Sequence, residues 1–469
     1  MRNFVHVILA ALLALSGCGG DDEVGSASSS SSADLSLQPA TPVFSPAPGV
    51  FTGASVSVSI STTTPGATIH YTTDGSEPTT GSTIYSGVAI PVDKAATIKA
   101  IAVKDGMLLP QSVIATGGWL KSNGSPSIST IATVAAQYGE VRGLAVSGSS
   151  VWVVSHDGER GYIFKYSDTG TLLGSYGTGT TTLNTATNDG ITPGAAYFKK
   201  LDGIVVSEPY VYVSEADGSG NTTLLNRIRR FSSDGSGTVT TVAGRGVAPL
   251  SWDDQSDWGN GGASVNARFN LPYRLVVDGP RFLVADYANR AIRSFEDGGI
   301  TQTVLYGNPP NGVNLLAGQS IAANRYDVNG PRGVVVSGSL VLFTDNNSGI
   351  YLLDRVNETV SLPLFSTVAG YTSSGTTPFW NNGSLAASSG CVYFYDSDMG
   401  ISPSGTRRIY RAPVHGGYIQ VLAGNGQDAS ADGPALSTGV EAAALAIAGG
   451  QVWFTEPATG KIRKFPVVE

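Results

Sequence analysis

Short apolar runs alternate along most of this chain with polar, glycine-rich segments, and residues 268–295 show the pattern most clearly. Residues 275–277 are apolar throughout, residues 282–285 are largely apolar, and residues 291–295 alternate between apolar and polar side chains. Runs of this length that are separated by turn residues are typical of β-strands. We therefore predict three strands here, in a small sheet with two apolar faces that cannot bury itself alone.

The same unit recurs six times. The first strands of the six copies start at residues 144, 204, 275, 334, 385 and 445. A second and a third apolar run follow each of them, and a fourth strand ends at a glycine in several copies, for example at Gly244, Gly370 and Gly424. Six copies with four strands each predict a six-bladed β-propeller, in which radial packing buries both faces of every sheet.

The way in which the ring closes is also predicted. The sixth copy has no fourth strand of its own, whereas an additional strand-like run at residues 129–134 precedes the first copy. We expect this run to cross the ring and to pair with residues 462–465, which would remove the last open sheet edge.

Several motifs in these copies resemble the NHL-repeat family. They are Ala-Arg-Phe-Asn-Leu-Pro at 267–272, Val-Ala-Asp at 284–286, Asn-Arg-Ala-Ile-Arg at 289–293 and Lys-Ile-Arg-Lys at 461–464. The resemblance implies a propeller over residues 128–469. It implies little about activity, because such propellers include both binding proteins and a few enzymes.

Residues 39–119 form a second predicted unit, whose alternating runs at 55–60, 68–71 and 97–103 indicate a small β-sandwich. The segment Pro-Gly-Ala-Thr-Ile-His-Tyr-Thr-Thr-Asp-Gly-Ser-Glu-Pro-Thr at 65–79 closely resembles the chitobiase/β-hexosaminidase C-terminal domain family. The resemblance implies a non-catalytic, immunoglobulin-like accessory module. Residues 120–127 are expected to be a linker, so the predicted fold class is all-β, a small β-sandwich followed by a six-bladed β-propeller.

The first 38 residues are predicted to be a targeting signal followed by a flexible tether. Arg2 precedes an apolar stretch at 4–15 that is too short to span a bilayer. The sequence Leu-Ser-Gly-Cys at 15–18 resembles a bacterial lipobox, which implies that residues 1–17 are removed as a signal peptide and that Cys18 is acylated. An ordinary secretory signal with a chance cysteine is the alternative. Residues 18–38, acidic and then serine-rich, should be a flexible tether to the lipid of the outer membrane.

Composition limits the classes of partner. Only 14% of the residues are charged, and the formal net charge is −8, whereas nucleic-acid binding requires a basic face. Cys391 is the only cysteine left if Cys18 is acylated, and its position in a predicted strand favours a buried, inert thiol.

The sequence shows no spacing of residues that is typical of a zinc site, a nucleophile elbow or a phosphate-binding loop. His70, His156 and His415 lie in separate regions and form no zinc-binding spacing, and no Gly-x-Ser-x-Gly or phosphate-binding loop occurs. A calcium ion is possible as a cofactor, because Asp345, Asp396 and Asp398 offer oxygen ligands. No other cofactor is expected.

The residue at the end of the second strand of each copy distinguishes structural residues from a candidate functional residue. The second strands end in five acidic residues and one histidine, namely His156, Glu215, Asp286, Asp345, Asp396 and Glu456. The repeated acids suit capping of the next turn. His156 breaks the repeat and is therefore a candidate ligand-binding residue.

Two groups of residues are predicted to face the same mouth of the propeller. The first consists of loop residues in which aromatic rings adjoin carboxylates and amides, a combination that suits a sugar; they are Trp252, Asp254, Asp257, Trp258, Trp380 and Asn382. These aromatic residues could instead be loop plugs packed on the blades. The second group lies at the starts of first strands and could bind a polar ligand or pair internally; it consists of Arg142, Asp202, Arg274 and Arg332.

These patterns favour a bacterial envelope lipoprotein whose propeller is a non-catalytic binding or scaffold module. The expected location is the outer membrane, and the expected partner is a polysaccharide or a surface protein. The alternative is a propeller-type lactonase, hydrolase or lyase with a carboxylate-bound calcium ion. A purely structural role in an envelope assembly is the third hypothesis.

Overall fold

The computed structural model describes residues 38–122, 124, 126–177, 189–216, 226–249, 255–307, 315, 318–346, 349–363, 365–366, 383–396, 407–426 and 431–467. Within these ranges the chain is all-β, and its helices are single 3-10 turns. None of the described helices has the length and apolar character needed to span a membrane.

Two facing sheets form the sandwich that the sequence predicts. One has the order β1-β3-β6 and the other the order β2-β8-β7-β4-β5. Their bounds are β1 Val43–Ser45, β2 Gly49–Phe51, β3 Val56–Ser61, β4 Thr68–Thr72, β5 Thr83–Ile84, β6 Ile90–Val92, β7 Ala96–Val103 and β8 Ala115–Lys121. Val58 and Ile60 from one sheet pack with Ile98 and Trp119 from the other. In β3 and β6 alternate residues face this core, as the period-two pattern of the sequence predicts, whereas β7 and β8 are buried along most of their length.

Six blades follow, and each is one sheet whose strands pair mostly in chain order. Blade 1 contains β10 Glu140–Ser147, β11 Ser150–His156, β12 Gly161–Ser167 and β13 Leu172–Tyr176; blade 2 contains β14 Leu201–Ser207, β15 Tyr210–Glu215, β16 Asn226–Ser232 and β17 Thr240–Gly246; blade 3 contains β18 Pro272–Asp278, β19 Arg281–Asp286, β20 Ala291–Glu296 and β21 Thr301–Tyr306. Blade 4 contains β22 Ser320–Ala322, β23 Val334–Ser337, β24 Leu340–Asp345, β25 Gly349–Asp354 and β26 Thr359–Ser361; blade 5 contains β28 Leu385–Ser388, β29 Cys391–Asp396, β30 Arg408–Pro413 and β32 Gln420–Ala423; blade 6 contains β34 Ala444–Ala448, β35 Gln451–Thr455, β36 Lys461–Pro466 and β9 Ser127–Thr133.

Short elements complete the structure. The two-residue strands β27 Phe365–Ser366 and β31 Gly417–Tyr418 pair with each other, and β33 Gly433–Pro434 pairs with β9. The 3-10 turns are η1 Ala136–Tyr138, η2 Gln255–Asp257, η3 Ser264–Asn266, η4 Tyr287–Asn289, η5 Ala323–Arg325 and η6 Ala435–Ser437.

The blades form a closed ring, as predicted. Their innermost strands contact one another in the order β10, β14, β18, β23, β28 and β34, and β34 contacts β10 again. The expected closure is confirmed, since β9 pairs antiparallel with β36 and places Ala132 opposite Ile462. The carboxylate of Asp432 accepts hydrogen bonds from both the backbone N and the Oγ1 of Thr130 at 2.7 Å, which fixes the closing strand.

Apolar clusters between neighbouring blades stabilise the ring. For example, Leu283 and Ala285 of blade 3 pack with Val341 and Phe343 of blade 4, and all four side chains are almost fully buried. Complete burial of one large apolar side chain contributes about 1.5–3 kcal/mol. Both faces of each sheet are therefore used, which explains the weak amphipathic alternation of the second strands.

The repeated acids at the ends of the second strands have a larger role than the predicted turn capping. Glu215, Asp286 and Glu456 are fully buried. Glu456 pairs with Arg463 at 2.6 Å, and Asp286 pairs with Arg293 at 3.3 Å. The charged pair ties the second strand to the third, because an unpaired buried charge would be strongly destabilising.

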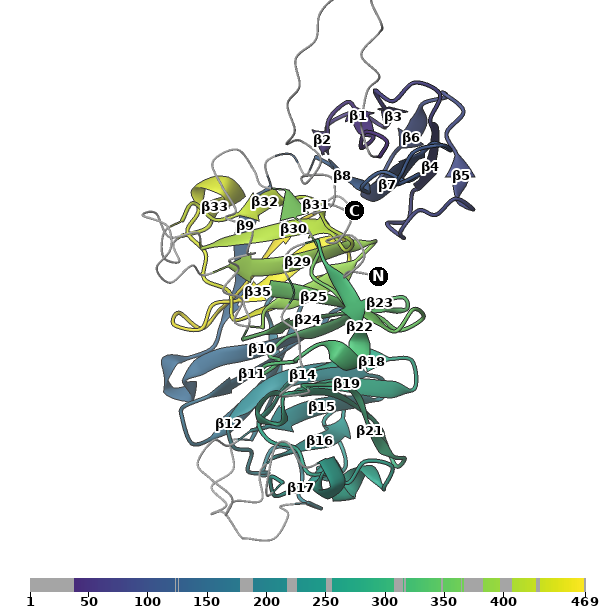
Figure 1. Ribbon diagram of the computed structural model, residues 1–469. Coiled ribbons are helices and arrows are strands. Elements are labelled where there is room, and N and C mark those ends of the chain that lie inside the picture. The colour runs from purple at the N-terminus through teal and green to yellow at the C-terminus, as the bar shows by residue number, and fades with distance from the viewer. Residues whose placement is uncertain are drawn as a thin grey trace, which may run out of the picture.

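The sandwich is attached to blade 5 more closely than a separate module with a free linker would be. Leu120 is completely buried, in one cluster with Tyr393 of blade 5, and the Oγ1 of Thr97 donates to the carbonyl oxygen of Gly416 at 3.2 Å. Leu120 and Lys121, expected to be linker, belong to β8, which contacts β31 (Figure 1).

Candidate binding site at the mouth of the propeller

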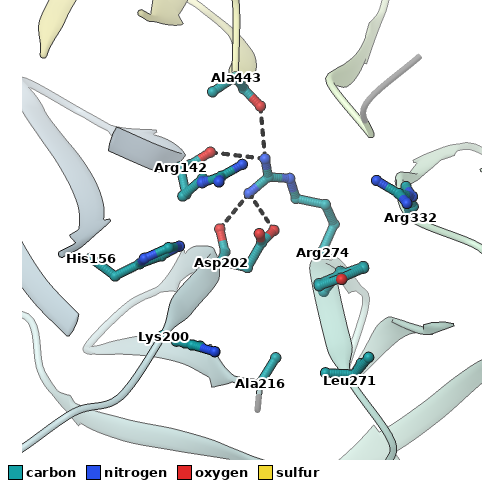
Figure 2. Close-up of a pocket in the computed structure, with 10 residues that line it drawn as sticks. Arg142, His156, Lys200, Asp202, Ala216, Leu271, Arg274, Arg332 and Ala443 are labelled. Carbon is teal, nitrogen blue, oxygen red and sulfur yellow. Dashed lines mark hydrogen bonds and ion pairs between the residues drawn. The ribbon is translucent and has the colours of Figure 1, made fainter. Parts of the chain in front are cut away.

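A cavity of about 350 Å³ lies where the innermost strands of the ring begin. We call it the mouth pocket; it is lined by Arg142, His156, Lys200, Asp202, Ala216, Leu271, Tyr273, Arg274, Arg332 and Ala443 (Figure 2). These residues come from blades 1, 2, 3, 4 and 6 or from the segments that lead into them. The symmetry of the fold therefore brings together side chains that are far apart in the sequence.

Arg274 lies at the centre of the mouth pocket and joins several blades. Its Nη1 forms an ion pair with the Oδ1 of Asp202 at 2.9 Å. Its Nη2 donates to the carbonyl oxygens of Arg142 at 2.8 Å and Ala443 at 2.7 Å (Figure 2). A planar guanidinium has donors on several sides, so this side chain satisfies strand ends that have no sheet partner at the mouth.

Two further arginines extend the positive surface. Arg142 forms an ion pair with Glu140 at 2.6 Å, and its buried Nε has no hydrogen-bond partner. The guanidinium of Arg332 lies 5.0 Å from the ring centre of Tyr287 and 5.9 Å from that of Tyr273. Stacking on two rings holds Arg332 in place and leaves donors for another group.

His156 is neutral and presents a donor to the pocket. The backbone N of Gly158 donates to its Nδ1 at 3.2 Å, so the proton of the neutral ring is carried by Nε2. Burial lowers the pKa of His156 below its usual 6.5, and the charge of Arg142 lowers that pKa further. Figure 2 shows the imidazole directed toward Arg142 and Asp202.

Two of the five described non-glycine residues with positive φ angles line the mouth pocket. Lys200 and Leu271 adopt positive φ angles of 36° and 56°, which are unfavourable for residues with a β-carbon. Both residues line the mouth pocket. Such strain is often found at functional sites, where the surrounding structure holds it.

The charges of the lining residues are strongly unequal. Arg142, Lys200, Arg274 and Arg332 carry positive charge, whereas Asp202 is the one carboxylate among the lining residues. This pattern inside a protein of net charge −8 makes the mouth pocket a positive site on an otherwise acidic chain. It can attract and hydrogen-bond an anion.

The structure brings together five of the predicted candidates, namely Arg142, His156, Asp202, Arg274 and Arg332. Four others, Trp252, Asp254, Trp380 and Asn382, lie outside the described residues. Lys200 and Tyr273 were missed. Tyr273 directly precedes Arg274, and Lys200 lies two residues before Asp202; this position at the strand starts is the signal that identifies them.

Asp257 and Trp258 correct the expectation of an exposed aromatic surface. Trp258 is only 1% exposed, and its ring lies 5.6 Å from the guanidinium carbon of Arg293. Asp257 pairs with Arg268 at 3.0 Å. This part of the loop is a packed plug, because the buried Arg293 donates to the Trp258 carbonyl oxygen at 2.9 Å and holds it down.

The carboxylates considered for calcium are engaged elsewhere or lie outside the described residues. Asp345 accepts a hydrogen bond from the hydroxyl of Tyr326 at 2.6 Å, and Asp398 is not described. Among the described residues, no three histidine, cysteine, aspartate or glutamate side chains gather closely enough to hold a metal ion. Cys391 is buried, as expected, and forms no disulfide within the part of the chain that the structure describes.

Comparison with known proteins supports the sandwich at the level of sequence. The model of the Chitobiase/beta-hexosaminidase C-terminal domain matches residues 46–114, within the predicted module. No curated protein matches the chain in sequence.

Several solved structures resemble the chain in part. A structural genomics protein of unknown function from Bacteroides thetaiotaomicron is 14% identical, with coverage of 91% of this chain and 97% of that protein and a TM-score of 0.48. An auxiliary nutrient binding protein from Bacteroides ovatus is 12% identical, with coverage of 93% and 99% and a TM-score of 0.46. A streptogramin B lyase is 14% identical, with coverage of 73% and 98% and a TM-score of 0.39. These scores are too low to support an argument about activity, which therefore depends on the mouth pocket itself.

Proposed function

We propose that this protein is a non-catalytic recognition module of the bacterial cell envelope and that its mouth pocket binds an anionic segment of a polysaccharide. The observation that carries the proposal is the set of four cationic side chains around a single lining carboxylate. Carboxylates on sugar rings would meet charge-assisted donors from Arg142 and Arg332, which are about twice as strong as neutral hydrogen bonds.

Two arginines of the mouth pocket are held in place by neighbouring groups, and this favours specific recognition of a ligand. Arg274 is held by Asp202 and by two carbonyl oxygens, and Arg332 is held by two tyrosine rings. Side chains that are already ordered lose little conformational entropy when a ligand binds. An acidic loop of a surface protein could offer the same carboxylates and is an outcome that the experiment below distinguishes.

Attachment to the outer membrane is part of the same proposal. It is based on the lipobox-like sequence that ends at Cys18 and on the serine-rich segment that follows it. A chain acylated at Cys18 would hold the sandwich and the propeller at the lipid surface through that tether. A Cys18→Ser variant expressed in a bacterial host should be recovered without acyl chains and outside the membrane fraction; membrane association of this variant would contradict the anchor.

The binding proposal is tested with a matched pair of ligands. A uronic-acid oligosaccharide and its methyl ester have the same sugar backbone, but only the first carries negative charge. We expect the acid to bind, as measured by titration calorimetry at low ionic strength, and the ester to bind at least tenfold more weakly. Arg332→Ala should weaken binding of the acid at least tenfold, about 1.4 kcal/mol.

Arg281→Ala is the control, because Arg281 is half exposed and pairs with Glu296 on the outer part of blade 3. It should bind the acid as the unaltered protein does. Equal binding of acid and ester, or equal loss in both arginine variants, would contradict the mouth pocket as the site. Binding of an acidic peptide but no oligosaccharide would identify a protein partner instead.

A further inference from the structure

A second and larger cavity lies between the sandwich and the propeller. Its volume is about 520 Å³, and we call it the interdomain cleft. One wall comes from the sandwich, with Asp74, Glu77 and Lys99, and the other comes mainly from blade 4, with Asp354 and Asn357. Ligand sites are frequent at the interfaces between domains, because two surfaces together can surround a ligand.

The sandwich packs directly on blade 5 beside the cleft. A β-carbon added at Gly118 of β8 would lie 2.8 Å from the backbone N of Tyr418 and 2.9 Å from the Cα of Gly417. A β-carbon at Gly75 would lie 2.4 Å from the ring of His415. Backbones approach this closely only where glycine is present. The two walls are therefore in direct contact beside the cleft, through backbone at Gly118 and through the His415 side chain at Gly75.

Hydrogen-bonding groups of both kinds line the cleft. Lys99 and Thr116 offer donors from the sandwich, while Asp354 and Asn357 on the propeller wall, together with Ser361, offer mainly acceptors and hydroxyls. A hydroxyl group donates and accepts at once, so a ligand with many hydroxyls can satisfy both walls.

The charge of the cleft differs from that of the mouth pocket. The carboxylates of Asp74, Glu77 and Asp354 exceed the positive charge of Lys99, and burial keeps the pKa of His415 below its usual value. An anionic ligand is therefore disfavoured here.

Apolar groups complete the propeller wall. Leu340, Leu352 and Pro363 line the cleft beside the polar residues. The carbon–hydrogen faces of a sugar ring can contact such groups while its hydroxyls bond elsewhere. From this combination we infer that the interdomain cleft binds an uncharged oligosaccharide, independently of the anionic ligand of the mouth pocket.

The test uses the whole soluble protein and a set of uncharged tetrasaccharides with different linkages, namely cellotetraose, maltotetraose and laminaritetraose. At least one should bind in titration calorimetry, and Lys99→Ala and Asn357→Ala should each weaken it at least fivefold. Asn357 is exposed and Lys99 is partly exposed, and thermal melting of both variants should match that of the unaltered protein. Two different variants keep the test valid if one of them fails to fold.

Two controls locate the site. Lys94→Ala alters an exposed lysine of the same sandwich outside the cleft, and Arg332→Ala alters the mouth pocket. Both should bind the tetrasaccharide normally. Absence of binding by all three sugars at millimolar concentration, or a loss of binding that is confined to Arg332→Ala, would overturn the inference.

Discussion

The Nη2 atom of Arg274 lies 2.7 Å from the carbonyl oxygen of Ala443, although Arg274 belongs to blade 3 and Ala443 directly precedes the first strand of blade 6. These two blades are opposite one another in the six-membered ring. One side chain therefore crosses the axis of the propeller and joins its two halves.

Removal of this connection should weaken the fold. In Arg274→Ala the carbonyl oxygen of Arg142 loses this donor, whereas that of Ala443 keeps only the Oγ of Ser384. A buried acceptor that is left unsatisfied costs about 1–3 kcal/mol. We expect the free energy of unfolding in urea to fall by about that amount. Arg274→Lys should recover only part of it, because an ammonium group cannot reach several carbonyl oxygens in one plane. Full recovery of the free energy of unfolding in Arg274→Lys would contradict this explanation, because the positive charge alone would then account for the stabilisation.

The buried pairs within the blades should have a larger effect. Arg293 and Asp286 have fully buried side chains, and removal of one partner from such a pair costs about 3–5 kcal/mol. Arg293→Met should lower the free energy of unfolding by this amount and release the loop that contains Trp258. Fluorescence of Trp258 should then move to longer wavelength, whereas Arg281→Met, at an exposed pair, should change neither property.

Stability should decline in mild acid because of two histidines. The folded pKa values of His156 and His415 lie below the usual 6.5 of the unfolded chain, through burial first and then through Arg142 and Lys99 respectively. Below pH 6.5 the unfolded chain binds more protons, so the free energy of unfolding should fall until the folded pKa values are passed. The double variant His156→Gln/His415→Gln should show a flatter profile in urea unfolding between pH 7.5 and pH 5. An unchanged profile would contradict these shifts.

Docking of the sandwich depends on one close backbone contact. Gly118→Ala would place a methyl group against the backbone of Gly417 and Tyr418, and overpacking of this kind costs about 1–3 kcal/mol. Proteolysis of the connection between Lys121 and Ser127 should become faster as the contact opens. Gly194→Ala, where no atom lies within 4 Å of the added carbon, should leave both melting and proteolysis unchanged.

Much of the fold could be predicted because the same physical requirement repeats six times. Residues 275–277, 282–285 and 291–295 lie in strands as predicted, and the pairing of Ala132 with Ile462 follows from the need to cover an edge. The mouth residues Arg142, Asp202, Arg274 and Arg332 were found by the same logic, since equivalent positions in the repeat surround one axis. The fold class and the sandwich are confirmed.

The features that the sequence does not predict depend on contacts that do not repeat from one copy to the next. Trp258 adjoins polar residues, as a sugar-binding residue would, yet it is buried because Arg293 binds its carbonyl oxygen. Leu120 was predicted to be linker, because nothing in a single apolar residue shows that blade 5 covers it. The sequence predicts that Asp286 caps a turn, whereas it pairs with Arg293, because the spacing of two charges does not show whether water reaches them.

The closing strand imposes an order on synthesis. The Oγ of Ser129 bonds the carbonyl oxygen of Lys464 across 335 positions of the chain. The ribosome synthesises β9 before the first five blades. The edge of β9 therefore stays unpaired until β36 of blade 6 has been synthesised. Contacts between such distant segments form slowly, and exposed edges favour aggregation. A nascent chain of this design therefore passes through a period in which its ring is open and vulnerable to misassociation.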